Sequence, residues 1–410
     1  MVRNLSVISV FKNGWIVVAM LFFVGVLNYL DRTMIVTMRI SMISSIPMTD
    51  AQFGLLTSVF LWVYGILSPI AGFMADRFKR SYVITGSLFA WSAVTWMTAH
   101  ATTYNELLVT RALMGISEAF YMPAALALIV DYHEGKTQSM ATGVNLAGVM
   151  TGQCLGFIGG WLAESHSWNY VFNVLGTIGI VYSVFLFFLL KDTDDRVIGM
   201  KKDVKDHPDF TEAIKVLFRH KSFIFLLLTF GVMGIVSWMV VGWLPTYYME
   251  KFHLSQSISG RYATLYLYLP SIAGLVLGGF LADRWSVINP RGRVFVPIIG
   301  LFIAAPFVFL ASRSEALILV ISFFGVYGLT KYFFDANTMP VLSLIVDSRY
   351  RATGYGILNL LSTIVGGVGI YAAGWLRDAQ VDLSKVFQLA SVIILICVGF
   401  LFVVKRQIKK

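Results

Sequence analysis

The chain has 410 residues, of which 57% are hydrophobic and only 13% are charged, and its mean hydropathy is +0.75. A soluble domain carries about 25% charged residues, so this composition excludes an ordinary soluble protein and indicates a chain that crosses a membrane many times. The net charge of +10 points to no nucleic acid partner, because no basic patch is interleaved with aromatic residues.

Twelve hydrophobic runs are long enough to cross a bilayer, which takes about 20 residues per helix. We therefore predict an all-α membrane protein with 12 transmembrane helices in two six-helix bundles. The first run contains Asp31 and Arg32 and has no small-residue cleavage site, so we expect a membrane helix there rather than a signal peptide. The runs lie near residues 14–38, 51–74, 82–100, 105–130, 138–163, 168–190, 222–248, 258–281, 294–311, 315–345, 353–376 and 386–404.

The distribution of Lys and Arg sets the expected orientation. If both termini are cytoplasmic, most of the 32 basic residues fall on the cytoplasmic side, as the positive-inside rule requires. We thus expect a multi-pass protein of the cell (inner) membrane with cytoplasmic N- and C-termini. The polar stretch after the sixth run predicts an N-terminal bundle over 1–190, a cytoplasmic linker over 191–221 and a C-terminal bundle over 222–410. Residues 210–218 have helical apolar spacing and are expected on the inner membrane surface.

One short signature occurs twice. Residues 72–77 read Gly-Phe-Met-Ala-Asp-Arg and residues 279–284 read Gly-Phe-Leu-Ala-Asp-Arg, which is typical of a transporter built from two parallel repeats. Both segments resemble the loop signature of the major facilitator superfamily, and the resemblance extends over essentially the whole chain and implies the major facilitator fold. Lys79 stands where that family commonly has Gly. The charges at these helix ends could cap neighbouring helices or latch an inner gate, so the gating candidates are Gly72, Asp76, Arg77, Asp283 and Arg284.

A narrower resemblance concerns three segments. Residues 28–32 read Asn-Tyr-Leu-Asp-Arg, residues 243–247 read Trp-Leu-Pro-Thr-Tyr, and Arg111 is followed by Glu118. All three are similar to the anion:cation symporter family, which carries hexuronates, galactonate, phthalate and sialic acid. The spinster-type lipid transporters share the first and third of these features, so the Trp-Leu-Pro-x-Tyr segment is what favours the anion symporters.

Charged side chains inside a membrane span are costly and are functional-site candidates by default. Arg111 and Glu118 are two helical turns apart, and Lys331 and Asp335 are one turn apart, so each pair shares a helix face. The alternatives are one polar cavity lined by a charged network and structural ion pairs between helices. Six residues qualify: Asp31, Arg32, Arg111, Glu118, Lys331 and Asp335.

Proton coupling would have to use carboxylates, because all six histidines lie in loops or at membrane edges. We expect Asp31 and Glu118 to carry protons, as the family resemblance also implies. Asp335 occupies the position that the repeat makes equivalent to Glu118. It is either a further proton site or the partner of Lys331.

Substrate recognition would fall to the permanent cations. Arg32 and Arg111 can each hold a carboxylate in a bidentate pair, and Lys331 could hold a second anionic group. Tyr29 and Tyr64 match positions where the family contacts substrate. For isolated polar residues the alternative is hydrogen bonding between helices. The complete set of lining candidates is Tyr29, Arg32, Tyr64, Arg111, Asn145, Gln153, Trp243, Lys331, Asn337, Tyr355 and Asn359.

Two further patterns have structural interpretations. Tyr247 and Tyr248 are expected in an aromatic belt at the outer membrane interface. Glycine recurs every four residues in the fifth span, which predicts a close approach of two helices. These glycines are Gly148, Gly152, Gly156 and Gly160.

The function that these features predict is secondary active transport. No Walker A loop, metal-ligand cluster or nucleophile elbow is present, so we expect neither an enzyme nor a cofactor, and a channel or a sensor fits the paired repeats less well. We predict proton-coupled symport of a small organic anion, a sugar acid such as a hexuronate, an aldonate or sialic acid. Sodium is not excluded as the coupling ion, and the remaining expected partners are membrane lipids around a monomer. The alternative is a spinster-like lysophospholipid transporter, which should have a lateral opening lined by apolar residues.

Overall fold

The computed structural model describes residues 13–133, 137–193, 210–289, 291–347 and 350–407. Within these ranges the regular secondary structure is helical throughout, as the sequence predicts. The first half contains α2 (Gly14–Thr37), α3 (Arg39–Ser45), α4 (Asp50–Arg77), α5 (Arg80–Thr98), α6 (Tyr104–Glu118), α7 (Tyr121–Tyr132), α8 (Gln138–Cys154), α9 (Phe157–Ser165) and α10 (Trp168–Leu189). The second half contains α12 (Phe210–Arg219), α13 (Lys221–Phe252), α14 (Gln256–Ile288), α15 (Gly292–Arg313), α16 (Leu317–Ile345), α17 (Arg351–Asp378) and α18 (Leu383–Gln407).

Eleven of the described helical segments are long and apolar enough to cross a membrane. The twelfth expected span is α5, a helix of 19 residues whose Ser and Thr side chains lower its hydropathy. These hydroxyls are satisfied inside the protein: Thr85 and Thr98 donate to carbonyls four residues earlier, both at 2.8 Å, and Ser87 donates to the Ser117 carbonyl at 2.5 Å. A hydroxyl that bonds the preceding turn can stay in an apolar environment.

The fourth span is divided between α6 and α7. Pro123 lies in the first turn of α7, and proline has no N–H to donate to the carbonyl four residues earlier. The regular helix is therefore interrupted just after Glu118, the last residue of α6. This break sits directly beside a buried carboxylate.

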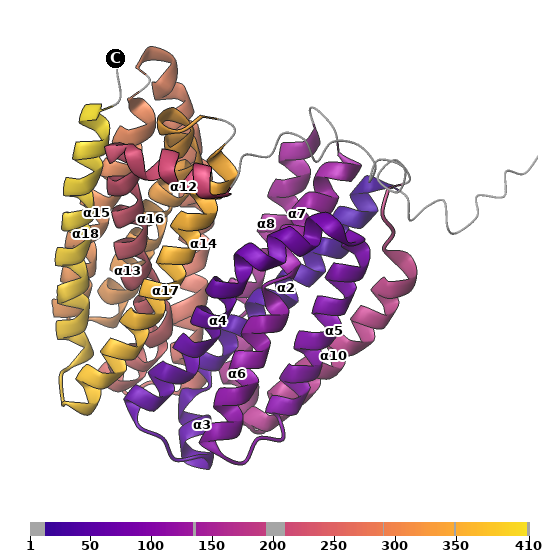
Figure 1. The fold of residues 1–410 in the computed structure, drawn as a ribbon. Coiled ribbons are helices and arrows are strands. Elements are labelled where there is room, and N and C mark those ends of the chain that lie inside the picture. Colours follow the sequence, from indigo (N-terminus) through magenta and orange to yellow (C-terminus); the bar gives the residue numbers. More distant parts are fainter. Residues whose placement is uncertain (1–12, 134–136, 194–209, 290, 348–349, 408–410) are drawn as a thin grey trace, which may run out of the picture. The chain divides into compact units, whose positions relative to one another are not determined.

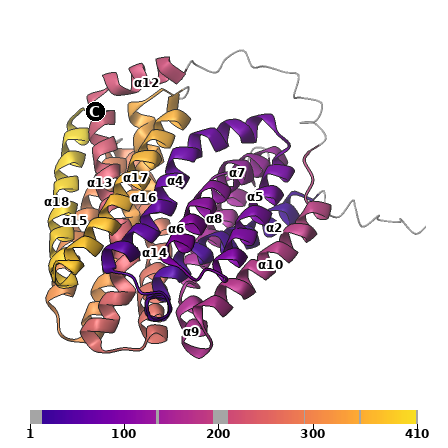
Figure 2. The same cartoon turned by 60° about the horizontal axis from the view of Figure 1, so that its bottom comes forward.

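The helices form two compact units. The first comprises Met1–Pro47 and Trp62–Val204, and the second comprises Met48–Leu61 and Lys205–Lys410. The helix α4 is shared, since its first part belongs to the second unit. Within the first unit α2 packs on α8, and α5 packs on α10. Within the second, α14 and α15 pack on α16, and α13 packs on α17 and α18. Figures 1 and 2 show each unit as a bundle of long helices.

Two glycines of α8 allow the contact with α2. A Cβ atom at Gly148 would lie 2.4 Å from the Phe22 carbonyl oxygen, and one at Gly152 would lie 2.4 Å from that of Val26. Only a residue without a side chain permits this approach. The predicted close helix contact is thereby confirmed for these two glycines, and it fixes the position of α2 within the first unit.

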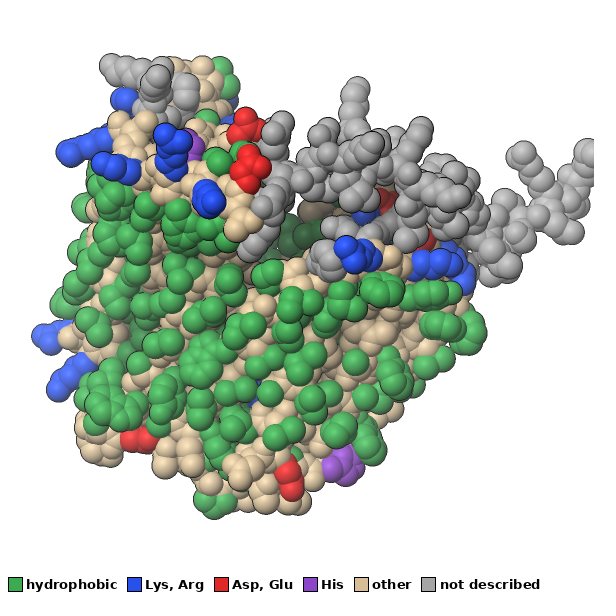
Figure 3. Space-filling view, viewed as in Figure 1, with side chains coloured by type: hydrophobic (Ala, Val, Ile, Leu, Met, Phe, Trp, Pro, Cys, Tyr) green, Lys and Arg blue, Asp and Glu red, His purple; other side chains and the backbone are tan. Residues whose placement is uncertain are grey.

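The outer flanks of both units are hydrophobic. Large side chains such as Phe188, Val276 and Ile318 are more than half exposed, and Figure 3 shows hydrophobic side chains covering the sides of the helices. Exposed apolar surface of this extent fits lipid rather than water. Lys and Arg side chains gather at the end of the second unit that carries the C-terminus (Figure 3).

The amphipathic segment before the second unit is helical as predicted. α12 buries Ala213 and Leu217 and exposes Lys215, and it lies across helix ends in Figure 2. Its apolar side packs on α13 and α17, and Tyr350 donates to Glu212 Oε1 at 3.0 Å. Protein, not lipid, therefore covers the buried residues of this helix. The linker residues 194–209 lie outside the described residues.

Candidate functional site

Four charged side chains meet inside the first unit. Asp31 and Arg32 come from α2, and Arg111 and Glu118 come from α6. None of the four is more than 9% exposed. We call them the ionic cluster; its two guanidinium groups balance its two carboxylates.

Within the cluster, Arg32 forms an ion pair with Glu118. Arg32 Nε donates to Glu118 Oε2 at 2.5 Å, and Asn28 Nδ2 donates to the same oxygen at 3.0 Å. Asn28 and Arg32 are one helical turn apart, so both reach Glu118 from one face of α2. The second oxygen, Oε1, is buried and accepts no hydrogen bond from a described residue. Glu118 is thus half satisfied, which leaves room for a proton or another donor.

Asp31 is held from a different helix. Thr95 Oγ1 on α5 donates to Asp31 Oδ2, while the buried Oδ1 has no hydrogen-bond partner among the described residues. The charges of Arg111 and Arg32 both act on this carboxylate. Neutralising one member of the ionic cluster would leave a charge of opposite sign buried without compensation, and this strongly destabilises a folded protein.

Two aromatic rings flank the Arg32 guanidinium. Its central carbon lies 4.6 Å from the ring centroid of Tyr29 and 4.3 Å from that of Tyr64. Cation–π contacts of this kind stabilise a desolvated guanidinium by about 2 kcal/mol. The predicted residues Tyr29, Tyr64, Arg32 and Glu118 therefore form one contiguous group in the first unit.

The polar residues of α8 are a separate pair of candidates. Asn145 is fully buried and its Oδ1 accepts from Tyr121 at 3.2 Å, whereas its Nδ2 has no partner among the described residues. Gln153 is half-buried, and its Oε1 is likewise unsatisfied there. Unsatisfied buried amide atoms of this kind are suitable positions for water or a ligand.

In the second unit, Lys331 and Asp335 form the ion pair that their spacing predicts. Lys331 Nζ lies 2.5 Å from Asp335 Oδ2, with side-chain exposures of 12% and 27%. Lys331 also lies 4.6 Å from the Tyr332 ring centroid. Asp335 is therefore a partner of Lys331, and a proton role for it stays a prediction.

The other lining candidates of the second unit differ in their surroundings. Asn337 is buried and donates to the Gly278 carbonyl at 3.1 Å, which is a hydrogen bond between α16 and α14. Tyr355 is 42% exposed and its ring centroid lies 6.3 Å from that of Phe230. Asn359 is half-buried. Asn337 therefore has the interhelical role that we gave as the alternative.

The Trp-Leu-Pro-Thr-Tyr segment lies inside the second unit. Trp243 Nε1 donates to the Ile370 carbonyl at 3.1 Å, and Tyr247 Oη donates to that of Ala311 at 3.1 Å. Both side chains are at most 2% exposed, and Tyr248 is fully buried. The aromatic-belt prediction for Tyr247 and Tyr248 is wrong, because neighbouring helices enclose both rings.

The family of the chain follows from a comparison of its sequence with family models. The model of the Major Facilitator Superfamily matches residues 21–370. This chain belongs to that family. It is thus a multi-pass membrane transporter and not an enzyme.

Within the superfamily, the chain is similar to spinster proteins. Protein spinster homolog 1 of Xenopus laevis is 24% identical over 92% of this chain and 75% of its own length. The sphingosine-1-phosphate transporter SPNS2 of Mus musculus is 26% identical over 86% of this chain and 68% of its own length. A crystal structure of a bacterial homologue of the human lysosomal transporter spinster, inward-facing and unoccupied, has a TM-score of 0.82 at 22% identity. It covers 97% of this chain and 98% of its own, so it shares the fold.

The predicted gating residues of this superfamily member lie at helix ends. Gly72 and Arg77 are in the last part of α4, and the side chain of Asp76 lies outside the described residues. Asp283 is 73% exposed and accepts from Arg293 Nη2 at 3.2 Å, and Arg284 is exposed. The pair between Asp283 and Arg293 lies within one unit, so a gating role stays a prediction.

The sequence did not predict a set of hydrogen bonds that Asp192 makes to the start of α5 in the first unit. Asp192 Oδ1 accepts from the backbone N–H of Arg80 at 2.9 Å, and its Oδ2 accepts from Ser81 Oγ at 2.5 Å. The Arg80 side chain pairs with Asp131 and donates to the Ala127 carbonyl. Asp192 thereby caps the start of α5, although its sequence position after the sixth span indicates only a solvated linker.

Proposed function

We propose that this transporter carries a phosphate-bearing amphiphile, such as a lysophospholipid, by alternating access. This choice rests on the similarity of the chain to spinster proteins, which extends over 92% of the chain. One of these relatives is named as a sphingosine-1-phosphate transporter. The sugar-acid prediction rested chiefly on the Trp-Leu-Pro-x-Tyr segment. Trp243 and Tyr247 donate to the Ile370 and Ala311 carbonyls, so their polar atoms already have hydrogen-bond partners within the second unit.

An apolar groove supports an amphiphile as the substrate. It has a volume of about 680 Å³ and lies between α14 and α16. Aromatic and aliphatic side chains line it, with Ser322 as its one hydroxyl besides those of two tyrosines: Tyr262, Tyr266, Pro270, Leu317, Ile318, Ile321, Ser322, Gly325, Val326 and Leu329. A hydrocarbon tail would be stabilised there by about 25 cal/mol per Å² of buried apolar surface, whereas a sugar acid would gain nothing.

The ionic cluster supplies a mechanism for the charged end. A phosphate oxygen and the Glu118 carboxylate are both acceptors for the same guanidinium, and Arg32 prefers planar bidentate partners. Entry of phosphate at Arg32 would release Glu118, which then takes a proton to avoid an unpaired buried charge. Departure of the substrate would reverse both steps. This exchange couples one proton to each substrate through Glu118.

A binding screen tests the substrate class. The purified protein in nanodiscs would be heated with lysophosphatidylcholine, sphingosine-1-phosphate or glucuronate, since a ligand at 100 times its Kd raises stability by about 2.7 kcal/mol. We expect the two amphiphiles to raise the Tm and glucuronate to leave it unchanged. A shift with glucuronate alone would reject the amphiphile and restore the sugar acid. Dodecyl maltoside, which has an alkyl tail but no phosphate, is the control for nonspecific effects of the tail.

A further inference from the structure

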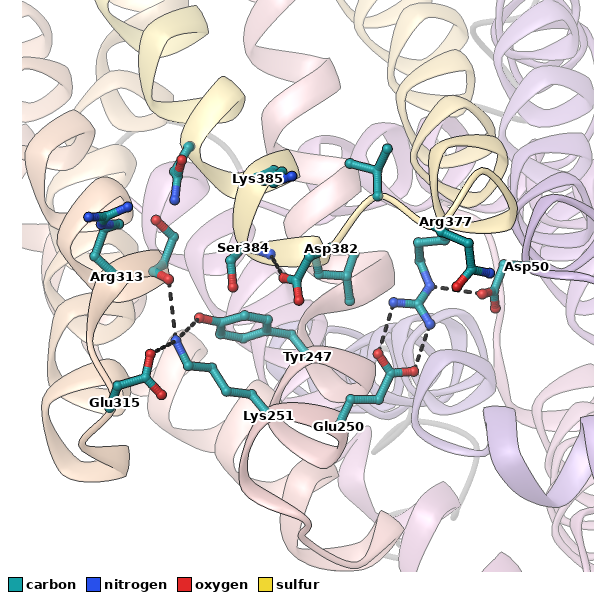
Figure 4. A pocket seen from close by; sticks show the side chains of 15 residues that line it. Asp50, Tyr247, Glu250, Lys251, Arg313, Glu315, Arg377, Asp382, Ser384 and Lys385 are labelled. Carbon is teal, nitrogen blue, oxygen red and sulfur yellow. Dashed lines mark hydrogen bonds and ion pairs between the residues drawn. The ribbon is translucent and has the colours of Figure 1, made fainter.

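A second polar site lies at the end of the second unit that faces away from the chain's C-terminal residues. A cavity of about 870 Å³ is lined there by the ends of α13, α15, α17 and α18 and by Asp50 at the start of α4. Figure 4 shows Arg377 with Glu250 and Asp50 on one side of the cavity, and Lys251 with Tyr247 and Glu315 on the other. Of the charged side chains that line it, four are basic and four acidic, so the cavity is neutral overall, yet its charges are not matched in pairs.

One side of this cavity is internally satisfied. Arg377 donates to both oxygens of Glu250, at 2.9 and 2.6 Å, and to Asp50 Oδ2 at 3.0 Å. Its guanidinium also lies 5.3 Å from the Trp243 ring centroid. A guanidinium that is paired with two carboxylates has few N–H groups left to bind a ligand. Arg377, Glu250 and Asp50 therefore form one side of the cavity and do not bind the ligand.

The opposite side of the cavity is lined by three cations. Arg313 at the end of α15 and Lys385 in α18 are exposed, and neither forms an ion pair with a described residue. Lys251 is mostly buried and is held by Tyr247 Oη at 3.2 Å and the Ser312 carbonyl at 3.3 Å. Its ion pair with Glu315 is 3.5 Å long, and Glu315 is 87% exposed, which makes that pair weak. An anion entering here would meet several cations.

The carboxylate of Asp382 lines the same cavity. Asp382 accepts from the backbone N–H of Ser384 at 2.6 Å and forms no ion pair with a described residue. Burial raises the pKa of Asp382, but hydrogen bonds from Ser384 and the charges of Lys251 and Arg377 outweigh it, and the net pKa lies below the usual value. Asp382 is therefore ionised at neutral pH.

Unpaired charges of both signs in one cavity match a ligand that carries both signs. We propose that this cavity binds the zwitterionic phosphodiester headgroup of an amphiphile, with Arg313 and Lys385 holding the phosphate and Asp382 holding the cationic group. The choice of an amphiphile rests on the function proposed above. If the positive-inside orientation holds, the cavity opens on the outer side of the membrane, and it would receive or release the headgroup there.

Water-soluble headgroups provide the test. Titration of the full-length protein in a maltoside detergent, followed by ³¹P NMR, would compare glycerophosphocholine with dimethyl phosphate, which has the same phosphodiester charge but no cation. Inorganic phosphate is the third probe and represents a free anion. Every protein in these titrations would also carry the Arg32→Lys substitution, because that substitution weakens any binding at the ionic cluster.

We expect glycerophosphocholine to bind at least fivefold more tightly than dimethyl phosphate or inorganic phosphate. Asp382→Asn should abolish that preference, and the double variant Arg313→Gln with Lys385→Gln should weaken both phosphodiesters at least tenfold. Arg261→Gln removes an exposed cation outside the cavity and should change nothing. Equal affinity for the three probes, or variants without effect, would overturn the proposal.

The two proposals fail separately. Correct headgroup selectivity without any transport of a tailed lysophospholipid would leave the cavity as a headgroup site and reject the proposed function. Transport of the lysophospholipid by the Asp382→Asn and double variants at wild-type rate, without headgroup selectivity in the titration, would reject only the cavity.

Discussion

In the first unit, the Arg32 guanidinium has a carboxylate and aromatic rings as neighbours at the same time. It contacts a carboxylate on one edge and an aromatic ring at each of two positions. Only a planar, permanently charged group can make all three contacts at once. Substrate recognition at this position would therefore depend on the shape of the cation as much as on its charge.

The Arg32→Lys variant tests this dependence on shape. Lysine keeps the positive charge but lacks the planar guanidinium group. We therefore predict that the affinity for lysophosphatidylcholine falls at least tenfold, a loss of about 1.4 kcal/mol of binding free energy. Arg261→Lys makes the same chemical change on the surface and is the control. Equal affinity of Arg32→Lys and wild type in equilibrium binding would remove Arg32 from the substrate site.

Glu118 is the residue whose protonation the proposed coupling requires. Glu118→Gln imitates the protonated form, so exchange of substrate across the membrane should persist while accumulation driven by a pH gradient is lost. Counterflow and uphill uptake in proteoliposomes measure the two activities. Asp31→Asn is the matched variant in the same cluster. If both variants still concentrate substrate, the proton is carried elsewhere, and Asp335 becomes the first alternative.

Among the helices, α2 and α8 are in close contact at Gly148. Ala at Gly148 would place a carbon 2.4 Å from the backbone of α2, and overpacking of this kind costs about 1–3 kcal/mol. Gly143 lies in the same helix with nothing within 4 Å of its Cβ position, so Gly143→Ala should be neutral or stabilising. Thermal unfolding of both variants measures the difference, and an equal Tm would contradict the close contact.

The helix α16 contains the charged pair of the second unit. Lys331→Met or Asp335→Asn alone leaves an uncompensated charge, which costs more than removing both. We predict that each single variant folds poorly, while the double variant recovers its elution profile and Tm without full transport. Two additive folding defects would argue against pairing, and wild-type uptake by the double variant would reduce the pair to a structural ion bridge.

Local spacing in the sequence was enough to predict some of these features. The pair of Lys331 and Asp335 lies within one helical turn, and the α8 glycines repeat every four residues, so both follow from helix geometry. The contact of Arg32 with Glu118 joins residues on different helices, and the sequence predicts only that both are buried charges. The environment of Tyr247 depends on which helices surround it, which is why the belt prediction failed.

At the scale of the whole molecule, the internal repeat and the hydrophobic runs identify the superfamily, but they do not identify the cargo. We propose that the cargo is recognised by a few polar groups that the fold brings together from distant segments, such as Arg313, Asp382 and Lys385 in one cavity. In the sequence these residues appear only as charges of outer loops. Fold and substrate therefore depend on different parts of the same chain.

Transport of a phosphate-bearing amphiphile can be measured directly in proteoliposomes. Proteoliposomes containing the protein would be loaded with a fatty-acid-free albumin acceptor and supplied with labelled lysophosphatidylcholine or labelled glucuronate under an inward pH gradient. We predict saturable uptake of the lysophospholipid, loss of that uptake in Arg32→Lys, and no uptake of glucuronate above empty liposomes. Saturable glucuronate uptake without lysophospholipid uptake would contradict the account.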